Sequence, residues 1–348
     1  MIDPANLTLS AALRAMKAGD LTAAALLEAC LERINAREPE VLAWVTMDRE
    51  AAREKAAAMD AAGRPGALGG IPVGLKDIIE TSDFGTEYNS IIYKGYRPPV
   101  DAAVVSTLKN AGSNILGKTV TTTFAHRNPG PTRNPHNPGH SPGGSSSGSA
   151  AAVADGMIPL ALGTQTGGSV LRPGAYCGVL AYKPAFDAIN FGGTKQISAT
   201  LDTLGFYVRS LDDIPIAGAA LQGLEGGLPV GDDTVAPKIT LIRTASWDQA
   251  DQAARDLVED VFDKLNVQWM LLISVLCSPV LKDKVQRHLI GLINHITVAF
   301  SHFATMIVHY ARAGLEIFFS SGEQFFGGIR YIRFGPENDY MGKHCQGW

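Results

Sequence analysis

The stretch Ser141-Pro-Gly-Gly-Ser-Ser-Ser-Gly-Ser-Ala-Ala-Ala-Val153 joins a glycine- and serine-rich turn to an alanine-rich run that predicts the start of a helix. Ile158-Pro-Leu-Ala-Leu162 follows as a strand, and Gly163-Thr-Gln-Thr-Gly-Gly-Ser169 as a second glycine-rich turn. Residues 128–149 carry proline and glycine at a density that neither a helix nor a central strand tolerates, which predicts a long loop that is either ordered or functional. Two turns with serine hydroxyls therefore bracket one helix and one strand.

Upstream of this unit, helical and strand patterns alternate. Residues 8–60 are rich in Ala, Leu, Glu and Arg and predict two or three amphipathic helices. One helical face is formed by Leu26, Leu27, Cys30, Leu31 and Ile34. The apolar run Ile71-Pro-Val-Gly-Leu75 ends on Lys76 and predicts a short buried strand; residues 104–111 continue as a helix and 114–120 as another strand. This alternation predicts an α/β layer fold, which we expect to be one large domain with a mixed sheet covered by helices.

Composition excludes several classes of protein. The 348 residues are 46% hydrophobic and 18% charged, which excludes disorder as the main state. Thirty basic and thirty-four acidic residues give a net charge of -4, so we expect no nucleic-acid partner. The four cysteines lie far apart without a CxxC pair, and the N-terminus has no signal-peptide pattern, which favours a reducing cytoplasm. His126, His136 and His140 lack a further ligand at a suitable spacing, so no metal site is expected.

The composition changes after about residue 265. Residues 266–348 hold twelve of the twenty-six aromatic residues but only four alanines, so we predict a core over 1–265 and an atypical helical tail over 266–348. A polar stripe in the tail recurs every seven residues, at His288, His295, His302 and His309. Successive histidines would lie roughly 10.5 Å apart along a helix, too far to share a metal. The stripe favours an interfacial or partner-facing helix over a membrane span. For the separate apolar run 267–281, a buried helix or strand is expected, because it contains Pro279.

A nucleophilic site is the chemistry that the two turns favour. Each offers a serine hydroxyl beside backbone N–H groups that glycines allow to converge on one oxygen. Serine needs a base within hydrogen-bonding reach, which is either histidine or a desolvated, neutral lysine. Lys76, at the end of a buried strand, suits the second role. Taken singly, a Gly/Ser turn is more often only a turn and a lone lysine an exposed charge, so the combination carries the inference.

Five motifs in this order resemble the amidase signature family, whose members hydrolyse carboxamides with a Ser-cisSer-Lys triad. They are Gly70–Asp77, Asn114–Thr119, Ser141–Val153, Gly163–Pro173 and Tyr182–Pro184. The resemblance covers about residues 5–265 and implies an α/β fold with an amidase-signature-like mixed β-sheet core covered by helices. Family members are usually longer, and their C-terminal part completes the sheet, so we expect an incomplete core and an atypical helical tail. A truncated or frame-altered gene is one explanation.

The resemblance also implies a role for each motif residue. Ser169 resembles the acyl-forming nucleophile, Ser145 the cis-peptide serine that relays protons, and Lys76 the general base. The oxyanion hole would be formed by backbone N–H groups of Thr166, Gly167, Gly168 and Ser169. Gly144 and Ser146 are expected to line the substrate site, whereas Arg172 either holds a substrate carboxylate or pairs with a nearby acid. No metal or organic cofactor is implied.

Alternatives remain open at this point. Gly144-Ser-Ser-Ser-Gly148 also fits the nucleophile elbow of α/β-hydrolases, with Ser146 as nucleophile, but prolines stand where that elbow needs a strand. Cys177 is more simply a small buried hydrophobe than a nucleophile.

We expect hydrolysis of a small carboxamide to carboxylate and ammonia through an acyl-enzyme at Ser169. One alternative is a truncated remnant with weak or absent catalysis. The other is a glutamine-hydrolysing amidotransferase subunit with partner chains, but Gln165 and Arg172-Pro173 favour a stand-alone amidase. The expected partner is a small-molecule amide. A homodimer, and a contact of the tail with a partner or a membrane surface, are left open.

Overall fold

The computed structural model describes residues 3–224, 238–241, 247–276 and 317–320, together with the single positions 228 and 243. Short 3-10 helices lie at Pro4–Asn6, Ile91–Tyr93, Thr123–Ala125 and Trp247–Gln249. The helices and strands are α1 (Leu9–Ala18), α2 (Ala23–Val41), β1 (Trp44–Met47), α3 (Arg49–Ala61), β2 (Pro72–Lys76), α4 (Ala103–Asn110), β3 (Asn114–Thr119), α5 (Ser147–Ala154), β4 (Leu160–Gln165), α6 (Leu171–Cys177), β5 (Leu180–Tyr182), β6 (Thr203–Val208), α7 (Asp213–Gln222), β7 (Lys238–Leu241), α8 (Gln252–Leu276) and β8 (Ile317–Ser320).

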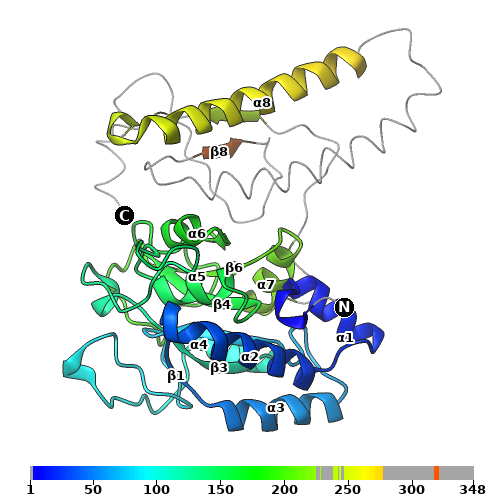
Figure 1. The fold of residues 1–348 in the computed structure, drawn as a ribbon, viewed down its shortest axis with the longest axis vertical. Helices are drawn as coiled ribbons and strands as arrows, with labels where there is room; N and C mark the ends of the chain where they lie inside the picture. Colours follow the sequence, from blue (N-terminus) through cyan, green and yellow to red (C-terminus); the bar gives the residue numbers. More distant parts are fainter. Residues whose placement is uncertain are drawn as a thin grey trace.

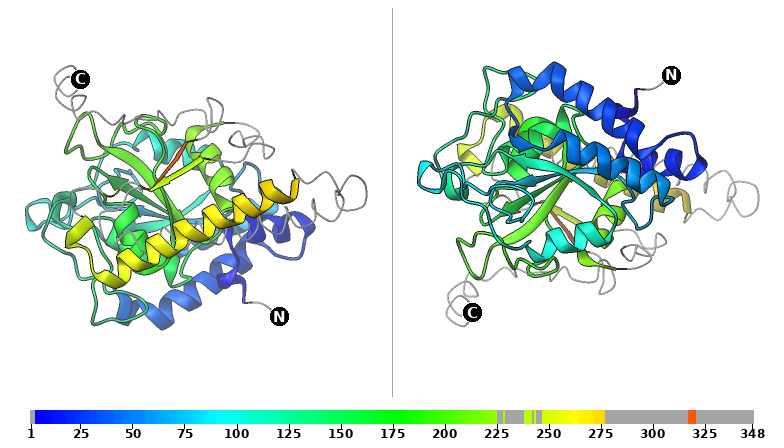
Figure 2. Two further views of the ribbon diagram at one scale, coloured as in Figure 1. Left: turned by 90° about the horizontal axis from the view of Figure 1, so that it is seen from above. Right: turned by 90° about the horizontal axis from the view of Figure 1, so that it is seen from below.

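A six-stranded mixed sheet organises these elements, in the order β1-β3-β2-β4-β6-β5. The central strand β2 runs parallel to both β3 and β4, whereas β1, β5 and β6 are antiparallel to their neighbours. Helices surround the sheet, as Figures 1 and 2 show. The predicted mixed sheet covered by helices is confirmed. Both faces of β2 are buried, which explains why its sequence is apolar as far as Leu75 instead of alternating.

The N-terminal helices form as their periodicity predicts. The face of α2 that carries Leu26, Leu27, Cys30, Leu31 and Ile34 is buried in the core. The Thr22 side chain accepts a hydrogen bond from Ala25 N, at 3.0 Å, and so caps the first turn of this helix. Strand β1, between α2 and α3, was not expected. It is only four residues long and lies at the edge of the sheet, so its sequence lacks the length and the alternation that would reveal it.

The predicted long loop is ordered by hydrogen bonds to its surroundings. Arg133 N donates to Val41 O at 2.8 Å, and the Thr132 hydroxyl donates to Leu42 O, also at 2.8 Å. The Asn134 side chain donates to Tyr176 O, and the His136 ring lies 2.8 Å from Cys177 O. These contacts attach the loop to the end of α2 and to α6. These hydrogen bonds therefore fix the position of the first glycine-rich turn, which is the last part of the loop before α5.

The C-terminal part is described only in pieces. Strands β7 and β8 form a separate antiparallel pair, with Lys238 opposite Ser320, and α8 runs through residue 265 to Leu276. The region predicted to be a helix or strand over 267–281 is helical as far as it is described. The histidine stripe from residue 288 to 309 lies outside the described residues, and the division at residue 265 stays a prediction. Within the described part, no helix combines the length and apolar character needed to cross a membrane.

Candidate active site

Lys76 is the last residue of β2 and is fully buried, because β3 and β4 flank the strand on both sides. Its Nζ lies 2.6 Å from Ser145 Oγ and 2.8 Å from Thr164 Oγ1, with the Thr164 carbonyl at 3.4 Å. None of these groups carries a formal charge. The amine thus lies buried among hydroxyl and carbonyl dipoles.

Burial lowers the pKa of Lys76 well below its ordinary value, because the ammonium form loses its hydration. The nearby Asp202 carboxylate opposes this effect and raises the pKa, but it is the smaller influence. A buried lysine without a carboxylate in hydrogen-bonding contact favours its neutral form. The neutral amine has a lone pair and can accept the proton of the Ser145 hydroxyl.

Lys118 provides a contrast within the same sheet. It is also fully buried, one strand away on β3, but its Nζ lies 3.2 Å from Asp77 Oδ1 and 2.5 Å from Thr86 Oγ1. Burial lowers the pKa of Lys118 to about 8, while Asp77 acts in the opposite direction. The ion pair with Asp77 therefore stabilises the charged form of Lys118. Lys76 has no such ion pair.

Ser145 lies at the end of the first glycine-rich turn, immediately before α5. The Gly144–Ser145 peptide bond is cis, and the Ser145 side chain is buried. The Ser145 carbonyl accepts a hydrogen bond from Thr122 N at 3.1 Å. Arg172 holds the cis peptide itself, because its Nε and Nη2 donate to the Gly144 carbonyl at 3.1 and 2.9 Å.

Arg172 is exposed and, within the described residues, makes no ion pair. Its observed partner is thus a backbone carbonyl and not the acidic side chain that one interpretation of the sequence expected. Two of its N–H groups donate to Gly144, and the others donate to no protein acceptor in the described part. The guanidinium braces the first turn while keeping donors that a ligand can use.

Ser169 is half-buried in the second glycine-rich turn, between β4 and α6. This turn is shorter than predicted and spans residues 166–169, because Gly163, Thr164 and Gln165 belong to β4. Its carbonyl accepts a hydrogen bond from Ser146 N at 3.3 Å, which joins the two turns. Tyr207 on β6 also donates to the Ser169 and Val170 carbonyls, at 3.4 and 3.0 Å. The structure therefore brings the turns of Ser145 and Ser169 together. Their two hydroxyls are not hydrogen-bonded to each other in the described structure.

The second turn presents free backbone donors. Among the described residues, the N–H groups of Thr166, Gly167, Gly168 and Ser169 donate to no protein acceptor. The Gln165 side chain fixes the far end of the turn instead, since its Oε1 accepts from Val170 N at 2.9 Å and from Leu171 N at 3.0 Å. Unoccupied amides beside a serine hydroxyl are available to a ligand oxygen that develops negative charge.

Ser146 and Cys177 are both engaged in the interior. The Ser146 hydroxyl is fully buried and exchanges 3.2 Å hydrogen bonds with both the carbonyl and the N–H of Thr164 on β4. A loop, and not a strand, precedes it. Cys177 is buried with its thiol donating to Pro142 O at 3.3 Å, and burial raises the pKa of this thiol above its ordinary value. These contacts fit structural roles for both side chains.

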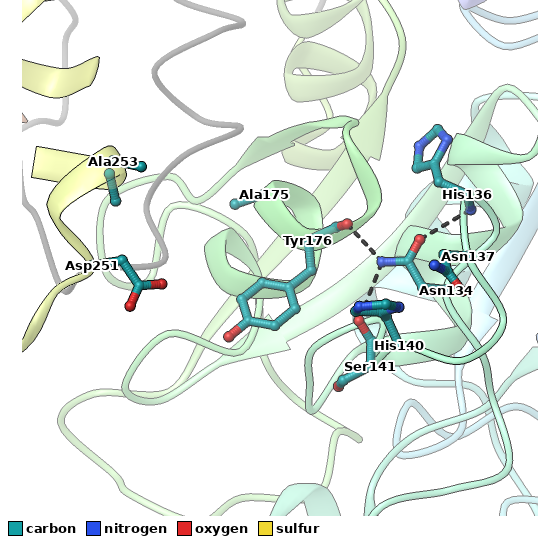
Figure 3. Close-up of a pocket in the computed structure, with 10 residues that line it drawn as sticks. Asn134, His136, Asn137, His140, Ser141, Ala175, Tyr176, Asp251 and Ala253 are labelled. Carbon is teal, nitrogen blue, oxygen red and sulfur yellow. Dashed lines mark hydrogen bonds between the residues drawn. The ribbon is translucent and has the colours of Figure 1, made fainter. Parts of the chain in front are cut away.

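Two cavities lie on the side of the turns. One of about 320 Å³ is bordered by Gly144 and carries the basic side chains His126, Arg127 and Arg172 with no acidic residue in its lining. A second, of about 400 Å³, lies between the long loop, α6 and the start of α8. Figure 3 shows the Tyr176 ring pointing toward the side of this cavity where Asp251 lies. Lys76, Ser145 and Ser169 line neither cavity, whereas the first adjoins the Gly144–Ser145 peptide.

No group of three or more His, Cys, Asp or Glu side chains gathers as metal ligands among the described residues. His136, one of the three histidines of the long loop, is engaged with the Cys177 carbonyl. Sequence reasoning missed Thr164 and Asp202. Thr164 lies inside a quoted motif but carries no sign of its contact with Lys76, and Asp202 precedes the buried strand β6, which was also unexpected.

The buried lysine, the two serine-bearing turns and the mixed sheet define the class of protein. The chain belongs to the amidase family, whose model matches residues 25–327. The match continues beyond residue 265, so the resemblance is wider than the motifs indicated.

Particular relatives match this chain over 49 to 60% of their own length. One subunit of the glutamyl-tRNA(Gln) amidotransferase of Chloroflexus aggregans is 40% identical over 250 residues, which cover 69% of this chain and 50% of the relative. The peptide amidase of Stenotrophomonas maltophilia superposes with a TM-score of 0.59 and 34% identity, over 64% of this chain and 49% of that one. A 6-aminohexanoate cyclic dimer hydrolase reaches a TM-score of 0.67 at 27% identity, over 77% and 60%.

Proposed function

We propose that this protein is a serine amidohydrolase that converts a small carboxamide to a carboxylate and ammonia through an acyl-enzyme at Ser169. One observation carries the proposal: the fully buried Lys76 amine lies 2.6 Å from Ser145 Oγ, beside the turn that holds Ser169. A neutral buried lysine next to a hydroxyl is an arrangement that can activate serine. Membership of the amidase family supports the reaction class, while the activity of the whole protein is part of the proposal.

In the proposed mechanism, Lys76 accepts the Ser145 proton while Ser145 takes the proton of Ser169. The Ser169 oxygen attacks the amide carbon, and the carbonyl oxygen becomes an oxyanion held by the free N–H groups of residues 166–169. Each such donor is worth roughly 3–4 kcal/mol in the transition state. The proton then returns through Ser145 to the leaving nitrogen, the C–N bond breaks and ammonia departs. Water repeats the sequence on the ester, which releases the carboxylate and restores Ser169.

The relay requires the hydroxyls of Ser145 and Ser169 to make contact. We expect that contact to close in the substrate complex, since catalytic hydrogen bonds often tighten only when substrate is bound. The hydrogen bond from Ser146 N to Ser169 O supports this, because the two turns already meet there. No step in the sequence needs a metal or an organic cofactor.

Substrate contacts are proposed on the side of Gly144. The 320 Å³ cavity there carries Arg127 and Arg172 without an acidic neighbour in its lining, which suits an amide that bears a carboxylate. Gly144 would contribute backbone to this wall. Ser146 was expected beside it, but its hydroxyl is committed to Thr164, so its proposed part is to hold the turn in place.

A glutamine-hydrolysing amidotransferase subunit is the second candidate. The observation in its favour is the 40% identity to subunits of glutamyl-tRNA(Gln) amidotransferases, although the chain spans about half the length of these relatives. This candidate predicts that the protein co-purifies with partner chains from its source, whereas a stand-alone amidase purifies alone or as a homodimer.

A non-catalytic remnant is the third candidate, and it predicts a cooperatively folded protein without nucleophilic reactivity. A cytoplasmic location remains part of the proposal, as does a contact of the tail with a partner or a membrane surface.

The experiment that tests the proposal needs no known substrate. The full-length protein is treated with a fluorophosphonate probe, and the adduct is mapped by peptide mass spectrometry. We expect labelling at Ser169 that is abolished in Ser169→Ala and reduced at least about 100-fold in Lys76→Ala, because the serine loses its base. An adduct at Ser146 would favour the α/β-hydrolase alternative. Labelling that is indifferent to Lys76→Ala would reject the proposed relay.

A further inference from the structure

Asp202 is a buried carboxylate that the proposed mechanism does not yet use. It is 5% exposed and, among the described residues, forms no ion pair. Instead its Oδ1 accepts from the Thr166 hydroxyl at 2.5 Å, and its Oδ2 accepts from the backbone N–H groups of Ile197 and Ser198 at 2.5 and 2.8 Å. The Asp202 carboxylate also acts on Lys76, whose pKa it raises.

The register of the sheet explains why Asp202 reaches the second turn. Strands β4 and β6 are antiparallel with Gln165 opposite Thr203, so the next pair beyond the end of both strands is Thr166 and Asp202. Side chains alternate along a strand, and Thr166 follows two residues after Thr164, whose hydroxyl contacts Lys76 Nζ. The Thr166–Asp202 pair therefore lies on the Lys76 side of the sheet, at the first residue of the turn that ends on Ser169.

We propose that Asp202 is a positioning residue of this site: through Thr166 it fixes the turn that carries Ser169, and its charge acts on the Lys76 amine. The inference rests on the proposed function. Removal of the Thr166 contact frees the first residue of the turn, and displacements of about 1 Å at a reacting centre can cost on the order of 100-fold in rate. Removal of the charge changes which protonation state of Lys76 is favoured.

The charge effect has a defined direction. Desolvation lowers the pKa of Lys76, and Asp202 partly opposes it by stabilising the ammonium form. Asp77, next to Lys76 in the chain, forms an ion pair with Lys118 at 3.2 Å, so the fields of these two groups largely cancel. Loss of the Asp202 charge therefore lowers the pKa of Lys76 further. The base is then neutral at lower pH, and the acidic limb of a pH–rate profile moves to lower pH.

The test is the rate of Ser169 phosphonylation by the fluorophosphonate probe from pH 5 to 10 in the full-length protein. For Asp202→Asn we expect a rate about 10- to 100-fold below that of the unsubstituted protein, with the acidic limb moved to lower pH. Thr166→Val removes the hydroxyl contact but keeps the charge, so it should slow labelling and leave the limb in place. Asp213→Asn is the matched control, because Asp213 is equally buried and accepts from the backbone N–H groups of Ser10 and Ser210, at 2.8 and 3.0 Å.

The outcomes separate this inference from the proposed function. If the unsubstituted protein is not labelled at Ser169, the proposed function fails first. The inference is overturned if the unsubstituted protein is labelled and a folded Asp202→Asn variant has the same labelling rate and the same acidic limb of the pH–rate profile. Asp213→Asn producing the same shift would also overturn it, since burial of any carboxylate would then suffice. Should Asp202→Asn not fold, Thr166→Val decides: an unchanged labelling rate in that variant rejects the positioning role.

Discussion

Two buried lysines, one strand apart, show how a single contact sets the chemistry of a residue. Lys118 is paired with Asp77, whereas Lys76 contacts only hydroxyl and carbonyl groups. Both have a lowered pKa because burial removes hydration, but only Lys76 lacks a carboxylate in contact. The lysine without a carboxylate in contact is the one that lies beside Ser145. Its lowered pKa reduces stability at neutral pH.

Lys76→Met should change the pH dependence of stability in a defined way. The pKa of Lys76 is about 10.4 in the unfolded chain and lower in the native state. Below about pH 10.4 the unfolded chain therefore binds a proton at Lys76 more readily than the native state does. As a result, the free energy of unfolding of the unsubstituted protein decreases as the pH falls, by at most ~1.4 kcal/mol per pH unit. Lys76→Met lacks this loss. The unfolding free energy of the variant minus that of the unsubstituted protein should therefore increase from pH 10 to pH 7.5. Urea unfolding at both pH values measures it, and a constant difference would mean that Lys76 is charged when folded.

At the residue scale, the motifs predicted which side chains to inspect but not all of their partners. Lys76, Ser145 and Ser169 stand in recognisable sequence contexts, and the structure brings their segments together. Arg172 was expected to hold either a substrate carboxylate or a nearby acid, but its contact with the Gly144 carbonyl depends on the path of a loop. Asp202 was missed, because only the register of β4 against β6 brings it to Thr166.

At the element scale, the site depends on how closely α5 packs against the ends of the strands. A Cβ on Gly148 would lie 2.2 Å from Ala43 O and 2.4 Å from Val120 N, both backbone atoms that cannot easily move. The glycine allows the helix to approach, and Gly148 N donates to Val120 O at 2.9 Å. Ser145, three residues earlier, is carried into place with the helix.

Gly148→Ala should therefore destabilise the protein by roughly 1–3 kcal/mol, the usual cost of overpacking a filled interior. Gly167→Ala is the matched control for stability, since a Cβ there meets nothing within 4 Å. Thermal or urea unfolding of both variants provides the comparison. Equal stability of Gly148→Ala and the unsubstituted protein would show that α5 lies farther from the sheet than described.

Elements with strong periodicity were predictable, and short ones were not. The buried face of α2 and the apolar runs of β2, β3 and β4 appear in the sequence because burial demands them. The short edge strand β1 carries no such pattern. Strand β6 is wholly buried. It lies between β4 and β5 because it pairs with both, and local sequence does not specify such long-range pairing.

At the scale of the whole molecule, the described core holds every residue of the proposed triad, whereas the chain spans about half the length of its curated relatives. The family match nevertheless reaches residue 327, past the change in composition at about residue 265. If the core is sufficient, the alternative of a catalytically silent remnant fails. Turnover by the full-length protein is thus the question on which the proposed function depends.

The most direct measurement is ammonia release from a panel of primary carboxamides, including glutamine and small amides that bear a carboxylate, with hydroxylamine present to trap the acyl group as a hydroxamate. We predict ammonia and the matching hydroxamate from at least one amide, and neither in Ser169→Ala. A cooperatively folded protein that releases no more ammonia than Ser169→Ala from any amide, and forms no hydroxamate, would contradict the assignment of this chain as an amidohydrolase.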